Sequence, residues 1–148
     1  MESFLGLGLW GMFLSAFLAA TILPLSSEIV LGCLITAGVG AVPVVAVATA
    51  GNVLGSCVNY WMGGAAAGWL ARHVNRVSAE DIRRARERFQ AWGTGSLLLA
   101  WMPVIGDPLT VVAGMLRVNL TVFLVLVTLG KLGRYLVIAG VCSGVMAG

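Results

Sequence analysis

The sequence predicts an all-α integral membrane protein with an internal repeat, short broken-helix hairpins and long transmembrane helices. Hydrophobic residues make up 59% of the 148 residues and charged residues only 10%, whereas soluble domains carry about 25% charged residues. Residues 3–27 and 29–71 hold no formal charge, and apolar runs above about 18 residues are typical of membrane spans. In addition, a proline is followed four residues later by a carboxylate at two places that lie 79 positions apart.

The hydrophilic linker, residues 72–92, divides a single membrane domain of residues 1–148 into repeats of about 1–71 and 93–148. Residues 72–88 contain six arginines and three acids, and short arginine-rich loops stay on the cytoplasmic side. Apolar residues recur in the linker at helical spacing, which predicts an amphipathic helix on the cytoplasmic membrane surface. Topology and lipid headgroup contact account for the arginines, so we expect no nucleic-acid partner.

An offset of 79 residues places Pro24 on Pro103 and Glu28 on Asp107. Because charges are so scarce in this chain, the shared proline-to-carboxylate spacing favours an internal repeat over a chance match of apolar residues. Repeats of this kind build many membrane transporters.

The arms around Asp107 are short: residues 94–102 and 108–118 make about 14 and 16 Å of helix, against a hydrocarbon core of about 30 Å. Either one kinked span holds Asp107 at its middle, or a re-entrant hairpin has its tip between Pro103 and Pro108. Each proline removes a backbone donor and breaks a helix, which favours the hairpin. By the repeat, Pro24 marks a first tip, although residues 3–22 are long enough to span fully.

Ionisable and polar residues stand out in the apolar halves because a charge near the bilayer centre costs at least about 2.5–3.5 kcal/mol and usually faces a cavity or a partner. The ionisable residues are Glu28, Asp107, Arg117, Lys131 and Arg134. Helical spacing puts Lys131, Arg134 and Tyr135 on one helix, and Asn52, Ser56, Asn59 and Tyr60 on the other long helix.

Two interpretations of these residues remain open. In the first, the acidic tips and the polar helix faces converge on a cavity, where Glu28 and Asp107 take up protons and the other residues bind a charged substrate. In the second, the two acids pair with Lys131 and Arg134 only to hold the bundle together. The sequence shows no nucleophile with a base, no histidine cluster and no phosphate-cradling loop, so we expect no enzymatic activity, cofactor or metal.

Three segments resemble the DedA family of membrane proteins (SNARE-associated, or VTT-domain, proteins), in particular its short YqaA-like branch. They are "LPLSSEIVL" (23–31), "GNVLGSCVNYWMG" (51–63) and "WMPVIGDPLTVVAGMLRVN" (101–119). The family's essential-acid role carries over to Glu28. Its second usual acid falls on Ser56 and its usual arginine on Gly106, so those roles do not carry over. "GKLGRY", which contains Lys131 and Arg134, looks like a pattern of the branch itself.

The resemblance implies an inverted repeat with two facing re-entrant helical hairpins. It also implies the translocation of lipids, often polyprenyl phosphates or phospholipids, frequently with proton coupling. We therefore expect a multi-pass flippase or scramblase in the inner (plasma) membrane that binds an anionic lipid headgroup and protons. Glycine faces such as Gly140 with Gly144 suggest a homodimer. The alternatives are a proton- or cation-coupled carrier of a small solute and a non-transporting membrane scaffold.

Overall fold

The computed structural model describes residues 2–20, 26–73, 79–102 and 105–147, and every regular element in them is helical. Pro24 and Pro103, the predicted hairpin tips, lie outside the described residues. The elements are α1 (Glu2–Ala19), α2 (Ser26–Thr36), α3 (Ala41–His73), α4 (Ala79–Arg88), the π-helix η1 (Phe89–Gly93), the 3-10 helix η2 (Thr94–Trp101), α5 (Gly106–Met115) and α6 (Leu120–Ala147). The predicted boundary between linker and second repeat, at residues 92–93, thus falls inside η1.

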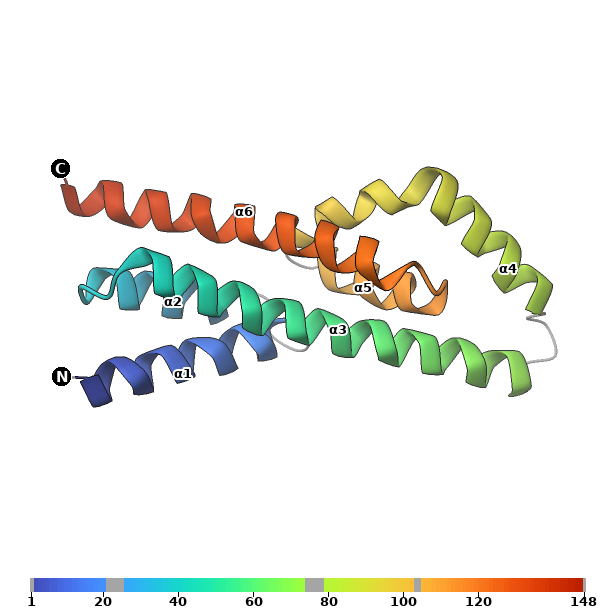
Figure 1. Ribbon diagram of the computed structural model, residues 1–148, viewed down its shortest axis with the longest axis horizontal. Coiled ribbons are helices and arrows are strands. Elements are labelled where there is room, and N and C mark those ends of the chain that lie inside the picture. The colour runs from blue at the N-terminus through green and yellow to red at the C-terminus, as the bar shows by residue number, and fades with distance from the viewer. Residues whose placement is uncertain (1, 21–25, 74–78, 103–104, 148) are drawn as a thin grey trace.

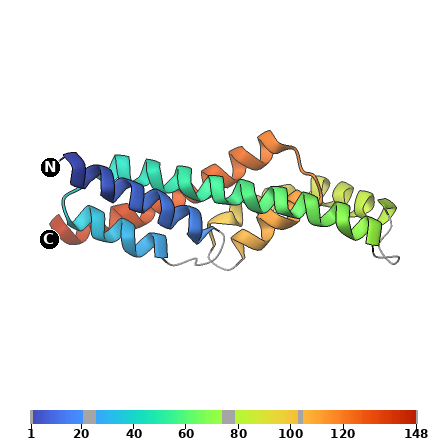
Figure 2. The same cartoon turned by 90° about the horizontal axis from the view of Figure 1, so that it is seen from below.

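The long helices α3 and α6 run antiparallel along the molecule (Figure 1). With 33 and 28 residues, they measure about 50 and 42 Å at the usual rise per residue. The stretches Ala41–Trp69 and Leu120–Gly144 are long and apolar enough to cross a membrane. Both chain ends lie at one end of the molecule, and α4 lies at the other (Figures 1 and 2).

Two pairs of short helices fill the space beside the long ones. α1 and α2 lie at the end that holds both termini, and η2 and α5 lie towards the end that holds α4 (Figures 1 and 2). α1 packs on α3 and α2 packs on α6, whereas η2 packs on α6 and α5 packs on α3. Each pair therefore contacts both long helices, in a crossed arrangement.

The chain leaves α2 and α5 through the same backbone motif. The N–H groups of Ala37, Gly38 and Val39 donate to the carbonyl oxygens of Cys33, Ile35 and Leu34, and 79 positions later those of Leu116, Arg117 and Val118 donate to Val112, Gly114 and Ala113. Gly38 (φ 87°) and Arg117 (φ 49°) occupy the left-handed region that this helix-ending motif requires. α3 and α6 then begin at positions that also lie 79 residues apart.

The helix α4 is exposed and packs mainly on η1. Its ion pairs join Arg83 to Glu80 (2.8 Å) and Glu87 (3.0 Å), and Arg84 to Glu80 (3.1 Å). The hydrogen bond that Arg83 donates to the Glu80 carboxylate, followed by the charge of Glu87, raises the pKa of the Arg83 guanidinium. Pairs this exposed contribute little to stability, so α4 is a charged, solvated appendage of the bundle.

Among the described residues, two apolar clusters lie in the interior. One lies among α1, α2, α3 and α6 and consists of Met12, Ala16, Leu31, Ile35, Val44, Val45, Ala48, Tyr135 and Ala139. The other lies among η2, α5, α6 and the turn before α6 and consists of Leu97, Ala100, Ala113, Val118, Phe123 and Val127. The outer surface is apolar as well: Val42, Trp61 and Val137 are 81%, 66% and 68% exposed. An exterior of this kind suits hydrocarbon rather than water.

Close contact between α3 and α5 depends on Gly63 and Gly114. A Cβ atom on Gly63 would overlap the carbonyl oxygen of Val111, and one on Gly114 would overlap that of Tyr60. We therefore expect Gly114→Ala to lower the free energy of unfolding by about 1–3 kcal/mol, because backbone must move to relieve the overlap. Thermal unfolding of the detergent-solubilised protein measures this change.

The matched control is Gly140→Ala on α6, because a Cβ atom at Gly140 meets nothing within 4 Å. Its unfolding temperature should equal or exceed that of the wild type, because alanine is favoured over glycine in a helix interior. If the two variants unfold at the same temperature, the close approach of α3 and α5 is not a constraint on the fold.

Candidate functional site

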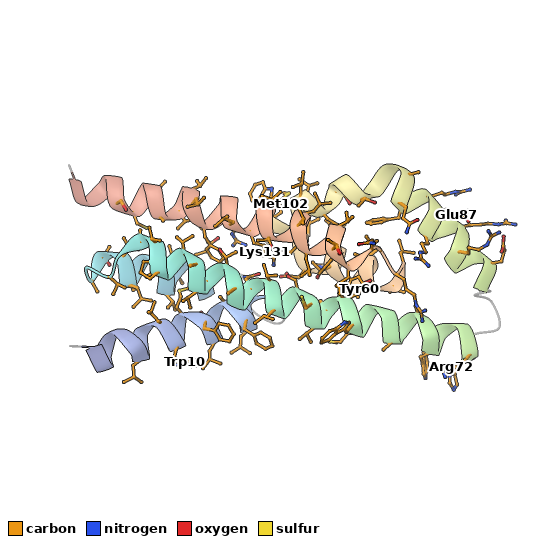
Figure 3. The ribbon with its side chains drawn as sticks, viewed as in Figure 1. Trp10, Tyr60, Arg72, Glu87, Met102 and Lys131 are labelled. Carbon is orange, nitrogen blue, oxygen red and sulfur yellow. The ribbon has the colours of Figure 1, made fainter. Side chains whose placement is uncertain are left out.

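A polar centre lies between the two apolar clusters, and α6 supplies both of its cations. Lys131 and Arg134 are three residues apart and therefore share a helix face, with Tyr135 beside them. Lys131 lies near the middle of the molecule, between α6 and α3 (Figure 3).

Lys131 is enclosed by two partners from two other helices. Its Nζ atom lies 3.0 Å from the Oδ1 atom of Asp107 and also donates to the side-chain oxygen of Asn52. Asp107 sits in the first turn of α5, where a negative charge is favoured by the helix dipole. The Lys131 side chain is only 3% exposed, and a buried charge needs partners to offset its lost hydration.

Arg134 on α6 forms a second ion pair and contacts both α2 and η2. Its Nε atom donates to the Oε1 atom of Glu28 at 2.7 Å, and a terminal nitrogen donates to the same oxygen. The other terminal nitrogen donates to the carbonyl oxygen of Trp101 at 3.1 Å. Glu28 lies in the first turn of α2, so this pair ties α2 and η2 to α6.

Hydrogen bonds connect the neighbourhoods of the two ion pairs. The Nδ2 atom of Asn52 donates to the Tyr135 hydroxyl (2.8 Å), and that hydroxyl donates to Ser27 (3.0 Å), the neighbour of Glu28. Asn52, Tyr135 and Ser27 are all buried. A continuous polar network thus runs from Asp107 through Lys131 to the start of α2.

The polar residues of α3 that the sequence singles out form a stripe whose members have different hydrogen-bond partners. Asn52 reaches the charged centre, while the Ser56 hydroxyl bonds back to the Asn52 carbonyl (3.0 Å). Asn59 donates to the Ala20 carbonyl (2.8 Å) and to the Thr110 hydroxyl (3.3 Å), so it bridges the two pairs of short helices. The Tyr60 hydroxyl instead donates to Val118 in the turn before α6 (2.6 Å). The stripe therefore does not face one cavity along its whole length.

Two further predicted residues lie at the ends of α5. Pro108 is in the first helical turn, where its missing N–H costs nothing. Arg117 is exposed in the turn after the helix, about 15 Å along the helix axis from Asp107, so the structure does not bring it to the charged centre.

Sequence reasoning missed Ser27 and Thr110. Ser27 accepts the Tyr135 hydrogen bond, and the Thr110 hydroxyl donates to the Asp107 carbonyl at 2.6 Å. A signal was present in both cases. Ser27 adjoins Glu28, and Thr110 lies three positions after Asp107, where a helix places it above the same face.

Two long apolar helices, an apolar exterior and paired charges held inside define a helical membrane protein. The sequence matches the VTT domain over residues 23–144, and the chain belongs to this family, also called DedA.

The chain is also similar to several individual proteins. The chain is 35% identical over 134 residues to the inner membrane protein YqaA of Escherichia coli, covering 90% of this chain and 89% of that protein. It is also 35% identical to an uncharacterised protein of Haemophilus influenzae (84% and 80% covered). An alkaline phosphatase-like protein of Lactococcus lactis is 30% identical (84% and 64% covered). No solved structure matches the chain.

The Lys131–Asp107 pair predicts an asymmetric mutant cycle. Asp107→Asn leaves the buried ammonium without its counter-charge and should lower the free energy of unfolding by about 3 kcal/mol. This value is at the lower end for a broken buried pair, because Asp107 is partly exposed. Adding Lys131→Met removes the stranded charge and should restore part of that stability. Unfolding in detergent, followed for wild type, both single variants and the double variant, measures the coupling.

Arg83→Gln on α4 is the control, since its ion pairs with Glu80 and Glu87 are solvated and their loss should leave the unfolding temperature unchanged. A double variant that is less stable than Asp107→Asn alone would contradict the assignment of Asp107 as the partner that neutralises Lys131.

Proposed function

We propose that the protein is a membrane transporter that translocates an anionic lipid between leaflets, as a proton-coupled flippase or as a scramblase. The observation that carries this proposal is the pair of cation–carboxylate contacts held inside an otherwise apolar bundle. A bare phosphate headgroup cannot enter hydrocarbon without a large desolvation cost. Lys131 and Arg134 supply the positive charge that offsets this cost, and the network through Asn52 and Tyr135 supplies polar contacts.

The architecture we propose is an inverted repeat in which α1–α2 and η2–α5 are re-entrant hairpins. With 11 and 10 residues, α2 and α5 measure about 17 and 15 Å and are too short to cross alone. The recurring helix ends support the repeat. So does the hydrogen bond between Lys131 and Asn52, which are 79 positions apart, because equivalent residues of a two-fold repeat meet at its axis.

Glu28 and Asp107 are the proton-carrying groups of this proposal. Each acid neutralises one cation of α6 in the structure, so protonation of the acid would release that cation for a phosphate. This exchange would make the ion pairs part of the transport cycle. The chemistry needs no covalent step, which is why we favour a transporter over an enzyme. By analogy with the E. coli relative, we place the protein in the inner (plasma) membrane.

The proposed topology predicts that α4 and the end of α6 face opposite sides of the membrane, with α4 in the cytoplasm. Single cysteines at Gln90, which is exposed on η1, and at Gly148, which follows α6, should react with a membrane-impermeant thiol reagent from opposite sides. The background lacks Cys33, Cys57 and Cys142. Labelling of both positions from one side would eliminate the inverted repeat.

The proposed activity predicts that proteoliposomes equilibrate a labelled polyprenyl phosphate or anionic phospholipid between leaflets. Glu28→Gln/Arg134→Gln should abolish this movement but preserve folding, because the change removes one charge of each sign and retains hydrogen-bonding groups. Glu80→Gln/Arg83→Gln on α4 replaces the same residue types in an exposed ion pair and should transport at the wild-type rate. Fluorescence quenching of the outer leaflet measures the rate, with and without a pH gradient.

The outcomes separate the alternatives. Acceleration by the gradient supports proton coupling, and equal rates with and without it leave a scramblase. A folded wild type that moves no lipid refutes the proposal. Uptake of a small solute by such a protein would then identify a solute carrier, and a lack of any transport would favour a scaffold in which the ion pairs only hold the bundle.

A further inference from the structure

An open groove lies on one flank of the bundle, between η2 and α6, and the Glu28–Arg134 pair forms part of its wall. Its volume is about 650 Å³, within the range of about 300–1,000 Å³ that small-molecule sites occupy. Leu98, Trp101 and Val137 are among the residues that line it. These three side chains are 44%, 43% and 68% exposed, so the groove opens laterally, towards the surface that the bilayer covers.

The lining of this lateral groove is amphipathic: it combines apolar residues with one ion pair. Apart from Glu28 and Arg134, the lining residues within the described part of the chain are apolar, namely Leu98, Trp101, Leu129, Gly130, Gly133, Val137 and Ile138. An apolar trough with a guanidinium in its wall matches a molecule with a hydrocarbon chain and an anionic head. A soluble anion would gain nothing from the trough, and a neutral lipid would gain nothing from the arginine.

The two cations of α6 differ in their relation to the groove. Lys131 and its partner Asp107 do not line it, and the ammonium is held between Asp107 and Asn52. Arg134 lines it, and its planar fork of donors suits a phosphate, which it binds through two parallel hydrogen bonds. Only one of the two buried cations is therefore placed to meet a ligand that arrives from the lipid.

We propose that the lateral groove holds the hydrocarbon chain of a phosphate-bearing membrane lipid, with the phosphate taking the place of Glu28 on Arg134. The inference rests on the proposed transport function and specifies where the substrate enters. At this entry step only the Glu28–Arg134 pair opens to the ligand, whereas the Asp107–Lys131 pair is still closed and keeps α5, α6 and α3 together.

Gly133 allows a direct test, because a Cβ atom there meets nothing within 4 Å and the residue lines the groove. Gly133→Trp should fill the groove without displacing backbone. Gly11→Trp on α1 is the control: it places the same side chain at another exposed glycine, again with nothing within 4 Å of the Cβ atom, at a residue that does not line the groove.

The probe is an anionic phospholipid with a photoactivatable diazirine in its chain, reconstituted with each variant. In the wild type, mass spectrometry should locate the cross-links in η2 and in the segment of α6 around Val137. Gly133→Trp should reduce these cross-links at least about tenfold, the loss expected when a few buried methylene groups are excluded, whereas Gly11→Trp should leave them unchanged. A diacylglycerol with the same chain tests the headgroup: Glu28→Gln/Arg134→Gln should abolish the preference for the phosphate lipid over it.

Each result decides between the groove and the proposed function. If wild-type protein moves lipid but Gly133→Trp moves and cross-links it equally well, the groove assignment is wrong and the transport function stands. If wild-type protein moves no lipid, the proposed transport function is refuted. If the diazirine lipid is absent from the groove and chemical cross-linking instead joins Val137 positions of two chains, the groove is a contact between copies and the lipid assignment is overturned.

Discussion

The structure depends on keeping two positive charges satisfied inside an apolar bundle. α6 carries Lys131 and Arg134 on one face, so the rest of the chain must deliver partners to that face. Asp107 comes from the start of α5 and Glu28 from the start of α2, while Asn52 comes from the middle of α3. These contacts fix how far each short helix reaches towards the centre, because a displacement by one turn would strand a charge.

The two halves share the motif that ends α2 and α5 and the offset at which α3 and α6 begin, but they differ in chemistry. Positions 52 and 55 of α3 correspond to Lys131 and Arg134 under the 79-residue offset, and they hold Asn52 and Gly55. Gly55 packs tightly against α1, where a Cβ atom would lie 2.7 Å from the Phe17 carbonyl oxygen, so no arginine fits there. Both carboxylates, Glu28 and Asp107, therefore pair with cations of the same helix, α6. The lateral groove beside α6 has one of these cations, Arg134, in its wall.

Stabilising and functional interpretations of these ion pairs are compatible. A ligand shifts a conformational equilibrium only as far as it binds one state better than another. A phosphate that competes with Glu28 for Arg134 would do so at a contact that also joins α2 and η2 to α6. The same interaction that orders the bundle would then be the one that the ligand exchanges, which couples binding to the positions of these helices.

The sequence by itself determined the membrane class and the long helices. It singled out the acids and cations that the structure pairs, because charges are rare enough in an apolar chain for each to carry information. It also gave both possible partners for Glu28 and Asp107 but left their pairing open, since spacing along a helix does not say which face meets which neighbour. Only the tertiary structure decided that Arg134 meets Glu28 and Lys131 meets Asp107, that Ser27 and Thr110 join the network, and that Tyr60 and Arg117 lie outside it. Those outcomes depend on the crossed packing of short helices on α3 and α6, a long-range arrangement that local hydrophobic patterns do not encode.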